Sequence, residues 1–200
     1  MKKRGAFICI EGLDGCGKTT QSRLLVRRLK RRGYDAVYTT EPSRGKIGGF
    51  IRKYFLHGEK RGSGIVEALL FAADRAEHVK EEVIPALDAG KVLVSDRYIY
   101  SSLAYQGATG LDLEWIAKIN EHAIRPDLAV FIDVEPGMVV KRLKTRKSVM
   151  ENLETQEKVK EVYERFVERG DLVEIDGNRL KEKVAENILE VVVSFLRKTR

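Results

Sequence analysis

Short apolar runs alternate along this chain with longer segments whose apolar residues recur at helical spacing. The runs are rich in strand-forming residues and predict five strands at residues 5–11, 36–39, 91–95, 128–134 and 172–176. The longer segments predict helices at residues 17–32, 45–57, 65–87, 100–106, 113–123, 151–169 and 180–196, with a further helix opened by Glu135-Pro136. This alternation predicts an α/β doubly wound fold, with a five-stranded parallel sheet and helices on both faces.

The alternation continues without an internal repeat or a low-complexity linker, which predicts a single domain over residues 1–200. Pro85 falls near the end of the long helix, where we expect the helix to close or bend because proline lacks a backbone N–H. In doubly wound sheets, ligands gather at the carboxyl ends of the strands. We therefore expect a site among the polar residues that follow the strands, namely Asp14, Glu41, Asp96, Arg97, Asp133, Glu135 and Asp176.

The first predicted strand leads into a glycine-rich loop. Residues 12–19 read G-L-D-G-C-G-K-T, a full match to the phosphate-binding pattern G-x-x-x-x-G-K-[ST]. Glycines let backbone N–H groups point at a phosphate, and the following helix adds its positive N-terminal end. Lys18 is placed to reach the β- and γ-phosphates of a nucleoside triphosphate, and the Thr19 hydroxyl is placed to bind Mg²⁺. The alternative is a strand-to-helix turn that binds nothing.

A charged pair follows the third predicted strand. Asp96 stands where a carboxylate can hold Mg²⁺ directly or through water, across from Thr19. It is also a suitable N-cap for the next helix, and we expect it to do both. Arg97 offers a planar guanidinium that can grip a phosphate with two hydrogen bonds; the alternative is a plain Asp–Arg surface pair.

Composition narrows the classes that remain. The net charge is +7, but the basic clusters at residues 2–4, 27–32 and 141–147 lack interleaved aromatic residues, so we expect solvated helix faces and no nucleic-acid partner. A basic balance also suits an anionic substrate such as a nucleotide. The positions of Cys9 and Cys16 predict neither a disulfide nor a zinc site, which favours a reduced, cytoplasmic setting. No apolar run approaches the roughly 18 residues of a membrane span, so we expect no membrane partner.

Several motifs outside the loop resemble those of one family. They are F-A-A-D-R at residues 71–75, D-R-Y at 96–98, S-S-L-A-Y-Q-G at 101–107, R-P-D-L at 125–128 and D-G-N at 176–178. Together with the loop they run over essentially the whole chain and resemble thymidylate kinase. The resemblance implies a P-loop kinase fold with a short lid at about residues 141–154, and transfer of the γ-phosphate of ATP to dTMP, giving dTDP and ADP, in dTTP synthesis. It also implies Mg²⁺ as the cofactor and a homodimer.

The resemblance assigns roles on the donor and acceptor sides. The implied ATP-binding residues are Gly12, Leu13, Asp14, Gly15, Cys16, Gly17, Lys18, Thr19 and Thr20, with Thr19 and Asp96 at the metal. Phe71 would stack on the thymine ring and Arg75 would hydrogen-bond its carbonyl edge, since a spacing of four places both on one helix face. The alternatives are core packing for Phe71 and a surface charge for Arg75.

Further acceptor contacts follow from the same resemblance. Ser102 resembles the residue at the base edge, and Gln106 belongs to the same implied substrate-binding set. Tyr105 resembles the residue under the deoxyribose, where it would disfavour a 2′-hydroxyl. Asp14 resembles the carboxylate near the sugar 3′-hydroxyl, and Arg97 resembles the clamp on the dTMP phosphate.

Two stretches depart from the family pattern. Many relatives carry E-P-G-G-T after the second strand, whereas this chain has E-P-S-R-G at residues 41–45, which leaves Glu41 and Arg44 as the candidates for substrate contact there. The lids of many relatives contain D-R-F-E, and this chain has S-V-M-E at residues 148–151, keeping only the carboxylate of Glu151.

The charge that stabilises the transition state needs a source other than the loop. Some members of the family place an arginine there, at the position of Gly15, which has no side chain. The lid is basic, and we expect Arg142 and Arg146 to be the donors because a guanidinium can grip two oxygens and a spacing of four puts both on one side of a helix. The alternative is a solvated basic helix end. The predicted catalytic residues are Lys18, Asp96, Arg97, Arg142 and Arg146.

Other functions remain as alternatives. The near alternative is another nucleoside or deoxynucleoside monophosphate kinase. A P-loop GTPase should carry the guanine motif N-K-x-D, which this sequence lacks, and a motor ATPase would usually carry a glutamate where Arg97 follows Asp96. Both observations favour the kinase, and a structural protein with a vestigial loop would bind no ATP.

Overall fold

The central sheet has five parallel strands, as the sequence predicts. The computed structural model describes residues 4–56, 63–143 and 152–198. The strands are β1 (Ala6–Gly12), β2 (Ala36–Thr40), β3 (Val92–Asp96), β4 (Leu128–Asp133) and β5 (Val173–Asp176). Their order in the sheet is β2-β3-β1-β4-β5, and each neighbouring pair is parallel. Each strand boundary lies within one residue of its predicted position.

Strand β1 lies at the centre of the sheet, and its side chains are covered on both faces. Phe7, Ile8, Cys9 and Ile10 are fully buried, as expected for an inner strand of a parallel sheet. β1 pairs with β3 on one side and with β4 on the other. The chain order reverses at this point of the sheet, and in such folds a ligand crevice opens there, beyond the carboxyl ends of the strands.

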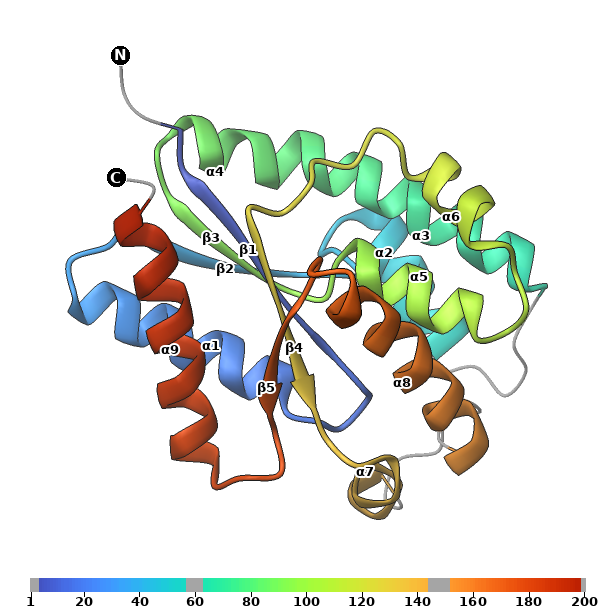
Figure 1. The fold of residues 1–200 in the computed structure, drawn as a ribbon. Coiled ribbons are helices and arrows are strands. Elements are labelled where there is room, and N and C mark those ends of the chain that lie inside the picture. Colours follow the sequence, from blue (N-terminus) through green and yellow to red (C-terminus); the bar gives the residue numbers. More distant parts are fainter. Residues whose placement is uncertain (1–3, 57–62, 144–151, 199–200) are drawn as a thin grey trace.

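Helices cover both faces of the sheet. The helices are α1 (Lys18–Arg31), α2 (Lys46–Ile51), α3 (Gly64–His78), α4 (Ile84–Asp88), α5 (Ile99–Gly107), α6 (Leu113–Ile119), α7 (Pro136–Leu143), α8 (Leu153–Glu168) and α9 (Lys181–Lys198). Helices α1 and α9 pack side by side on one face, and α4, α5 and α8 lie on the other (Figure 1). Helix α7 follows the carboxyl end of β4, close to the loop after β1 (Figure 1).

Two predicted helices have a different form in the structure. The prediction over residues 65–87 becomes α3, a π-helical turn η2 (Val79–Val83) and α4, so Pro85 does not end the helix but follows a wider turn. Proline supplies no N–H and crowds the preceding turn, and the π-helical turn accommodates this. The prediction over residues 45–57 likewise becomes α2 and a second π-helical turn, η1 (Arg52–Leu56).

Helix α6 ends at Ile119, four residues before its predicted end at residue 123. The side-chain amide of Asn120 donates a hydrogen bond of 2.8 Å to the carbonyl of Ile116. Asn120 is buried and its side-chain oxygen faces α3, so a tertiary contact fixes the end of this helix.

The predicted lid is only partly described. Lys141 and Arg142 belong to α7, whereas residues 144–151, which include Lys144, Arg146, Lys147 and Glu151, lie outside the described residues. In the ranges that the structure describes, no helix combines the length and the apolar character that a membrane crossing requires.

Candidate functional site

The loop between β1 and α1 has the backbone geometry of a phosphate cradle. Gly12 and Gly17 have φ values of 145° and 102°, a region that favours glycine. A Cβ at Gly12 would also lie 2.8 Å from the carbonyl oxygen of Ile132. Among the residues that the structure describes, no side chain caps the N-terminus of α1, and the first turn of this helix holds no acidic residue. The first N–H groups of α1 are therefore available to an anion.

Lys18 is folded into this loop. Its ammonium group donates hydrogen bonds of 2.9 and 2.6 Å to the carbonyls of Gly12 and Leu13. The residue is only 5% exposed. Its charge is therefore held at the loop, beside the uncapped helix end.

Thr19 and Asp96 meet across the first and third strands, as the sequence predicts. The Thr19 hydroxyl donates a hydrogen bond of 2.5 Å to a carboxylate oxygen of Asp96, and Tyr38 donates to the same oxygen at 3.2 Å. The expectation that Asp96 also caps the next helix is wrong. The N-cap of α5 is Tyr98, with no side-chain cap, because the Asp96 carboxylate turns towards Thr19 and Tyr38 instead.

One hydroxyl and one carboxylate are a suitable protein share of a magnesium site. Mg²⁺ usually keeps several waters and adds phosphate oxygens to one or two protein ligands. In the described part of the chain, no group of three or more His, Cys, Asp or Glu side chains could hold a metal unaided. The donor set of Thr19 and Asp96 therefore fits Mg²⁺ that arrives with a nucleotide.

Arg97 joins the loop to helix α5. Its φ of 72° is in the left-handed region, which is strained for a residue with a side chain. Its guanidinium donates hydrogen bonds to Asp14 of the loop and, at 3.1 Å, to Ser101, and lies 5.0 Å from the ring centre of Tyr105. Burial alone would lower the pKa of Arg97, but the electrostatic effects of Asp14, Tyr105, Tyr163 and Asp96 together more than offset this and raise it. The structure thus brings Asp14, Arg97 and Tyr105 together.

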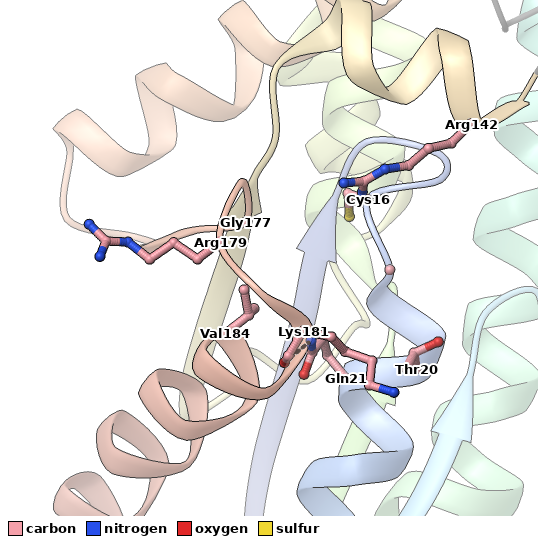
Figure 2. Close-up of a pocket in the computed structure, with 9 residues that line it drawn as sticks. Cys16, Thr20, Gln21, Arg142, Gly177, Arg179, Lys181 and Val184 are labelled. Atoms are coloured by element: carbon pink, nitrogen blue, oxygen red, sulfur yellow. Dashed lines mark hydrogen bonds between the residues drawn. The ribbon is translucent and has the colours of Figure 1, made fainter.

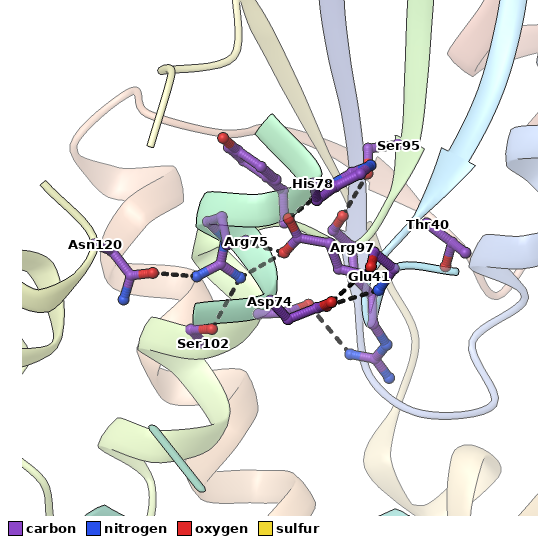
Figure 3. Close-up of polar contacts among 12 residues, drawn as sticks. Thr40, Glu41, Asp74, Arg75, His78, Ser95, Arg97, Ser102 and Asn120 are labelled. Carbon is purple, nitrogen blue, oxygen red and sulfur yellow. Dashed lines mark hydrogen bonds and ion pairs between the residues drawn. The ribbon is translucent and has the colours of Figure 1, made fainter. Parts of the chain in front are cut away.

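Arg75 is the centre of a second polar cluster. It donates to a carboxylate oxygen of Glu41 through Nε at 2.9 Å and Nη2 at 2.6 Å, to Asn120 through Nη1 at 2.5 Å and to the Ser102 hydroxyl through Nη2 at 3.0 Å (Figure 3). It is 2% exposed. The alternative of a helix-surface charge is therefore wrong, because the side chain points into the protein between α3, α5 and α6.

Glu41 supports this cluster rather than facing solvent. Both carboxylate oxygens are engaged, since Oε2 accepts from Arg75 and Oε1 lies 3.0 Å from Nδ1 of the buried His78. The next residues are anchored too, because the backbone N–H and hydroxyl of Ser43 both donate to Asp74, at 2.7 and 2.6 Å. Arg44 is exposed, and its expected contact with a substrate stays a prediction.

The remaining residues that we expect to contact the phosphate acceptor are three on α5 and one on α3. Ser102, Tyr105 and Gln106 follow one another at helical spacing on α5, and all three are buried. The amide oxygen of Gln106 has no hydrogen-bond partner among the residues described by the structure. Such a buried acceptor is costly unless a ligand or water satisfies it. Phe71 is half-buried and lies outside the buried core, which disfavours the alternative of core packing.

A cavity of about 220 Å³ lies between the loop after β1, the start of α1 and the connection from β5 to α9. Its lining residues are Cys16, Gly17, Thr20, Gln21, Arg142, Gly177, Arg179, Lys181 and Val184. In Figure 2, Arg142 reaches over the loop from α7 towards Cys16, while Arg179 points away. Gln21 donates a hydrogen bond of 3.0 Å to the carbonyl of Lys181 and joins α1 to α9 below the cavity. The lining residues that the structure describes include Arg142, Arg179 and Lys181 and no carboxylate, so the cavity suits an anionic ligand.

Several residues of the site were not identified from the sequence. Glu11, His78 and Asn120 are buried polar residues that hold the expected site residues through side-chain contacts. The one local signal was a carboxylate, Glu11, inside an apolar strand. Asn120 had none, because its partner Arg75 lies 45 residues away in sequence.

Comparison with known proteins agrees with this arrangement. A family model described as thymidylate kinase matches residues 10–188. The chain is 49% identical to a probable thymidylate kinase of Thermococcus onnurineus, over 82% of this chain and 84% of that protein. It is 44% identical to a probable thymidylate kinase of Pyrococcus abyssi, over 94% and 96% of the two chains. A thymidylate kinase of Caldanaerobacter subterraneus subsp. tengcongensis is 39% identical, over 97% and 98%.

Proposed function

Since the chain belongs to the thymidylate kinase family, we propose that it transfers the γ-phosphate of ATP to dTMP and so yields dTDP and ADP for dTTP synthesis. It is a phosphotransferase whose two substrates occupy the two sides of the loop after β1. The observation that carries the proposal is the contact between Asp14 and Arg97. This ion pair links the loop that cradles a triphosphate to the arginine suited to hold the acceptor phosphate.

The donor side accounts for ATP. The loop N–H groups and the N-terminus of α1 would hold the phosphates, and the cavity beneath Arg142 would take the remainder of the nucleotide. Thr19 and Asp96 would hold Mg²⁺, which would neutralise charge on the transferring phosphate. Lys18 adds a positive charge that is already confined to the loop.

The acceptor side accounts for a thymine nucleotide. Arg75 uses four hydrogen bonds to protein groups and keeps a fixed orientation, so its one remaining N–H and the Ser102 hydroxyl can meet the carbonyl edge of a base. Gln106 adds the unsatisfied amide oxygen. Phe71 offers a half-buried ring for stacking.

Arg97 is suited to hold the acceptor phosphate. A guanidinium binds phosphate with paired, charge-assisted hydrogen bonds. Asp14 and Ser101 fix the Arg97 guanidinium beside the ring of Tyr105. Tyr105 is buried, and a 2′-hydroxyl pushed against the face of its ring would lose hydration without gaining a partner.

Catalysis also needs positive charge over the moving phosphoryl group. Gly15 supplies no side chain, but a terminal nitrogen of Arg142 comes within 3.5 Å of the Gly15 carbonyl. This position supports the assignment of Arg142 to the transition state. Arg146 keeps the same assignment as a prediction from the sequence, since it lies outside the described residues.

A homodimer is the assembly that the surface supports. Phe50, Tyr54, Ile65, Val66 and Leu69 are each about half exposed, and they cluster on α2, η1 and α3. Exposed apolar residues that gather on one face mark interaction surfaces. Light scattering should give the mass of two chains for the parent and of one chain for Leu69→Glu. The buried, unpaired thiols of Cys9 and Cys16 support a cytoplasmic location.

The experiment that tests the function measures ADP release with dTMP, dUMP, UMP, dCMP, AMP and GMP as acceptors. We expect strong preference for dTMP over UMP, because the extra hydroxyl against Tyr105 costs roughly 1–3 kcal/mol. Comparable kcat/KM values for UMP and dTMP would contradict the assignment. Preference for another acceptor would identify a different nucleoside monophosphate kinase.

A further inference from the structure

The carboxylate of Glu11 is buried at the base of the phosphate-binding loop. Glu11 is the residue of β1 directly before Gly12, and it has no exposed surface. A buried carboxylate is costly unless hydrogen bonds satisfy it. Its role therefore depends on the groups that surround it.

Three donors converge on this carboxylate. One oxygen accepts the backbone N–H of Tyr98 at 2.9 Å. The other accepts the hydroxyls of Ser101 at 2.6 Å and of Tyr163 at 3.1 Å. The partners come from the turn after β3, from α5 and from α8, between 87 and 152 residues away in sequence. Glu11 thus ties the strand that leads into the loop to three distant segments.

Ser101 connects Glu11 to Arg97. Its hydroxyl hydrogen goes to Glu11, which leaves the oxygen free to accept from Nη1 of Arg97 at 3.1 Å. The direction of the first bond sets that of the second, because a hydroxyl has one hydrogen to donate. Because the Glu11 carboxylate accepts the hydroxyl hydrogen of Ser101, the Ser101 oxygen is oriented to accept from the Arg97 guanidinium.

Ile10 and Glu11 of β1 together fix the backbone on both sides of the arginine. Arg97 has the left-handed φ of 72°, its N–H donates to the carbonyl of Ile10 and its carbonyl accepts from the Ser95 hydroxyl. The next N–H, of Tyr98, donates to Glu11. Strained conformations persist where the surroundings over-determine them. Residues 10 and 11 of β1 supply two of these contacts.

We propose that Glu11 is a positioning residue for the acceptor phosphate, acting through Ser101 and the Tyr98 N–H to hold Arg97 in its phosphate-binding orientation beside the loop. The inference rests on the proposed function, since it takes Arg97 as the group that binds the phosphate of dTMP. Glu11 itself touches neither substrate. Because Glu11 and Gly12 are adjacent, the end of β1 then positions both the phosphate-binding loop and the guanidinium of Arg97.

The substitution Glu11→Gln tests this role while keeping the shape of the side chain. Glutamine has one oxygen and one NH₂ group, so it cannot accept from Tyr98 on one side and from two hydroxyls on the other. Ser101→Ala removes the link to Arg97 and leaves Glu11 in place. Tyr163→Phe is the matched control, because it removes the hydroxyl that contacts Glu11 and Ser101 at 3.1 Å each. It keeps the hydrogen bonds of Ser101 to Glu11 and Arg97 and the ring stacked 4.8 Å from that of Phe131.

The measurement is calorimetric binding of dTMP and of thymidine, which lacks the phosphate. We expect Glu11→Gln and Ser101→Ala each to weaken dTMP binding by roughly tenfold, which corresponds to the loss of about 1.4 kcal/mol. Thymidine binding and the KM for ATP should stay within roughly twofold, and the double variant should be no worse than Glu11→Gln alone, because Ser101 lies between Glu11 and Arg97 and adds no route of its own. Tyr163→Phe should lower the unfolding temperature with less than a threefold change for dTMP.

The outcomes separate this inference from the proposed function. A parent protein that neither binds nor phosphorylates dTMP would overturn both. A parent that phosphorylates dTMP, with variants that weaken dTMP and thymidine equally or weaken neither, would overturn the positioning role alone. If Glu11→Gln fails to fold, Ser101→Ala tests the positioning role through the same comparison of dTMP and thymidine affinities.

Discussion

The hydroxyl of Thr19 donates a 2.5 Å hydrogen bond to a carboxylate oxygen of Asp96, although the two residues are 77 positions apart in sequence. Thr19 lies in the first turn of α1 and Asp96 ends β3. Parallel strands bring their carboxyl ends to one edge of the sheet, so the contact follows from the topology. The pair provides the oxygen donors that Mg²⁺ prefers, directly beside the phosphate-binding loop.

Substituting Asp96 by Asn should therefore weaken the use of Mg²⁺. The amide keeps the volume but loses the charge that attracts the metal. We expect the Mg²⁺-dependent rate to fall by at least roughly 10–100-fold, as for other groups that support a metal, when kcat is followed against MgCl₂ concentration. Tyr38→Phe, which removes only the 3.2 Å hydrogen bond to the same oxygen, should change kcat less than threefold. Equal effects of the two substitutions would argue against a metal role for Asp96.

Arg75→Ala should impair the acceptor side and the stability of the protein. The substitution leaves Glu41 buried without its cationic partner, and breaking such a pair costs about 3–5 kcal/mol. In urea unfolding we expect a loss of this order. In kinetics of the folded variant we expect the KM for dTMP to rise while the KM for ATP stays near that of the parent. An unchanged KM for dTMP would leave Arg75 a structural residue only.

Arg142→Ala should reduce the rate of phosphoryl transfer. The side chain reaches the Gly15 carbonyl and lines the cavity beside the loop, where a cation would meet charge that develops on the moving group. We expect kcat to fall by at least roughly 10²-fold with a modest change in the KM for ATP. Lys141→Ala provides a control with a neighbouring exposed cation of the same helix. If Arg142→Ala, Arg146→Ala and the double variant all keep kcat within a few-fold, the charge comes from Lys18 and Arg97.

The titration of Glu11 should appear in the pH dependence of stability. Burial raises the pKa of Glu11 above its ordinary value of 4.5, so the folded protein holds a proton at this site more tightly than the unfolded chain. The contribution of this site to the free energy of unfolding then falls as the pH rises from 4.5 through the folded-state pKa. We expect the advantage of the parent over Glu11→Gln, measured by denaturant unfolding, to shrink over that range. A difference that grows with pH would contradict the raised pKa.

The sequence predicted the strands and the loop because their signals are local. The strand from Ala6 to Gly12 and the glycine pattern behind it each occupy a few consecutive residues, and the alternation with helices gave the parallel sheet. The order of the strands was not predicted, since it depends on packing between segments far apart in sequence. The wider turn before Pro85 and the early end of α6 at Ile119 were missed for the same reason.

The site shows the same limit. Asp96 was expected across from Thr19, and the structure brings the two into contact. Asp14 and Arg97 were expected only as members of the group of polar residues that follow the strands, and their direct contact was not. The support around them was not expected, because Glu11 alone collects partners from three distant segments. A carboxylate within an apolar strand was the visible signal, but its partners could be found only from the fold.

The most direct test of the account follows the phosphorus atoms themselves. Phosphorus NMR of the protein with Mg²⁺, ATP and dTMP should show the dTMP signal replaced by the two signals of dTDP, at the same rate as ATP is converted to ADP. Inorganic phosphate should not accumulate, because the γ-phosphate passes to the acceptor and not to water. Release of inorganic phosphate with dTMP left intact would contradict the account and identify a nucleoside triphosphatase instead.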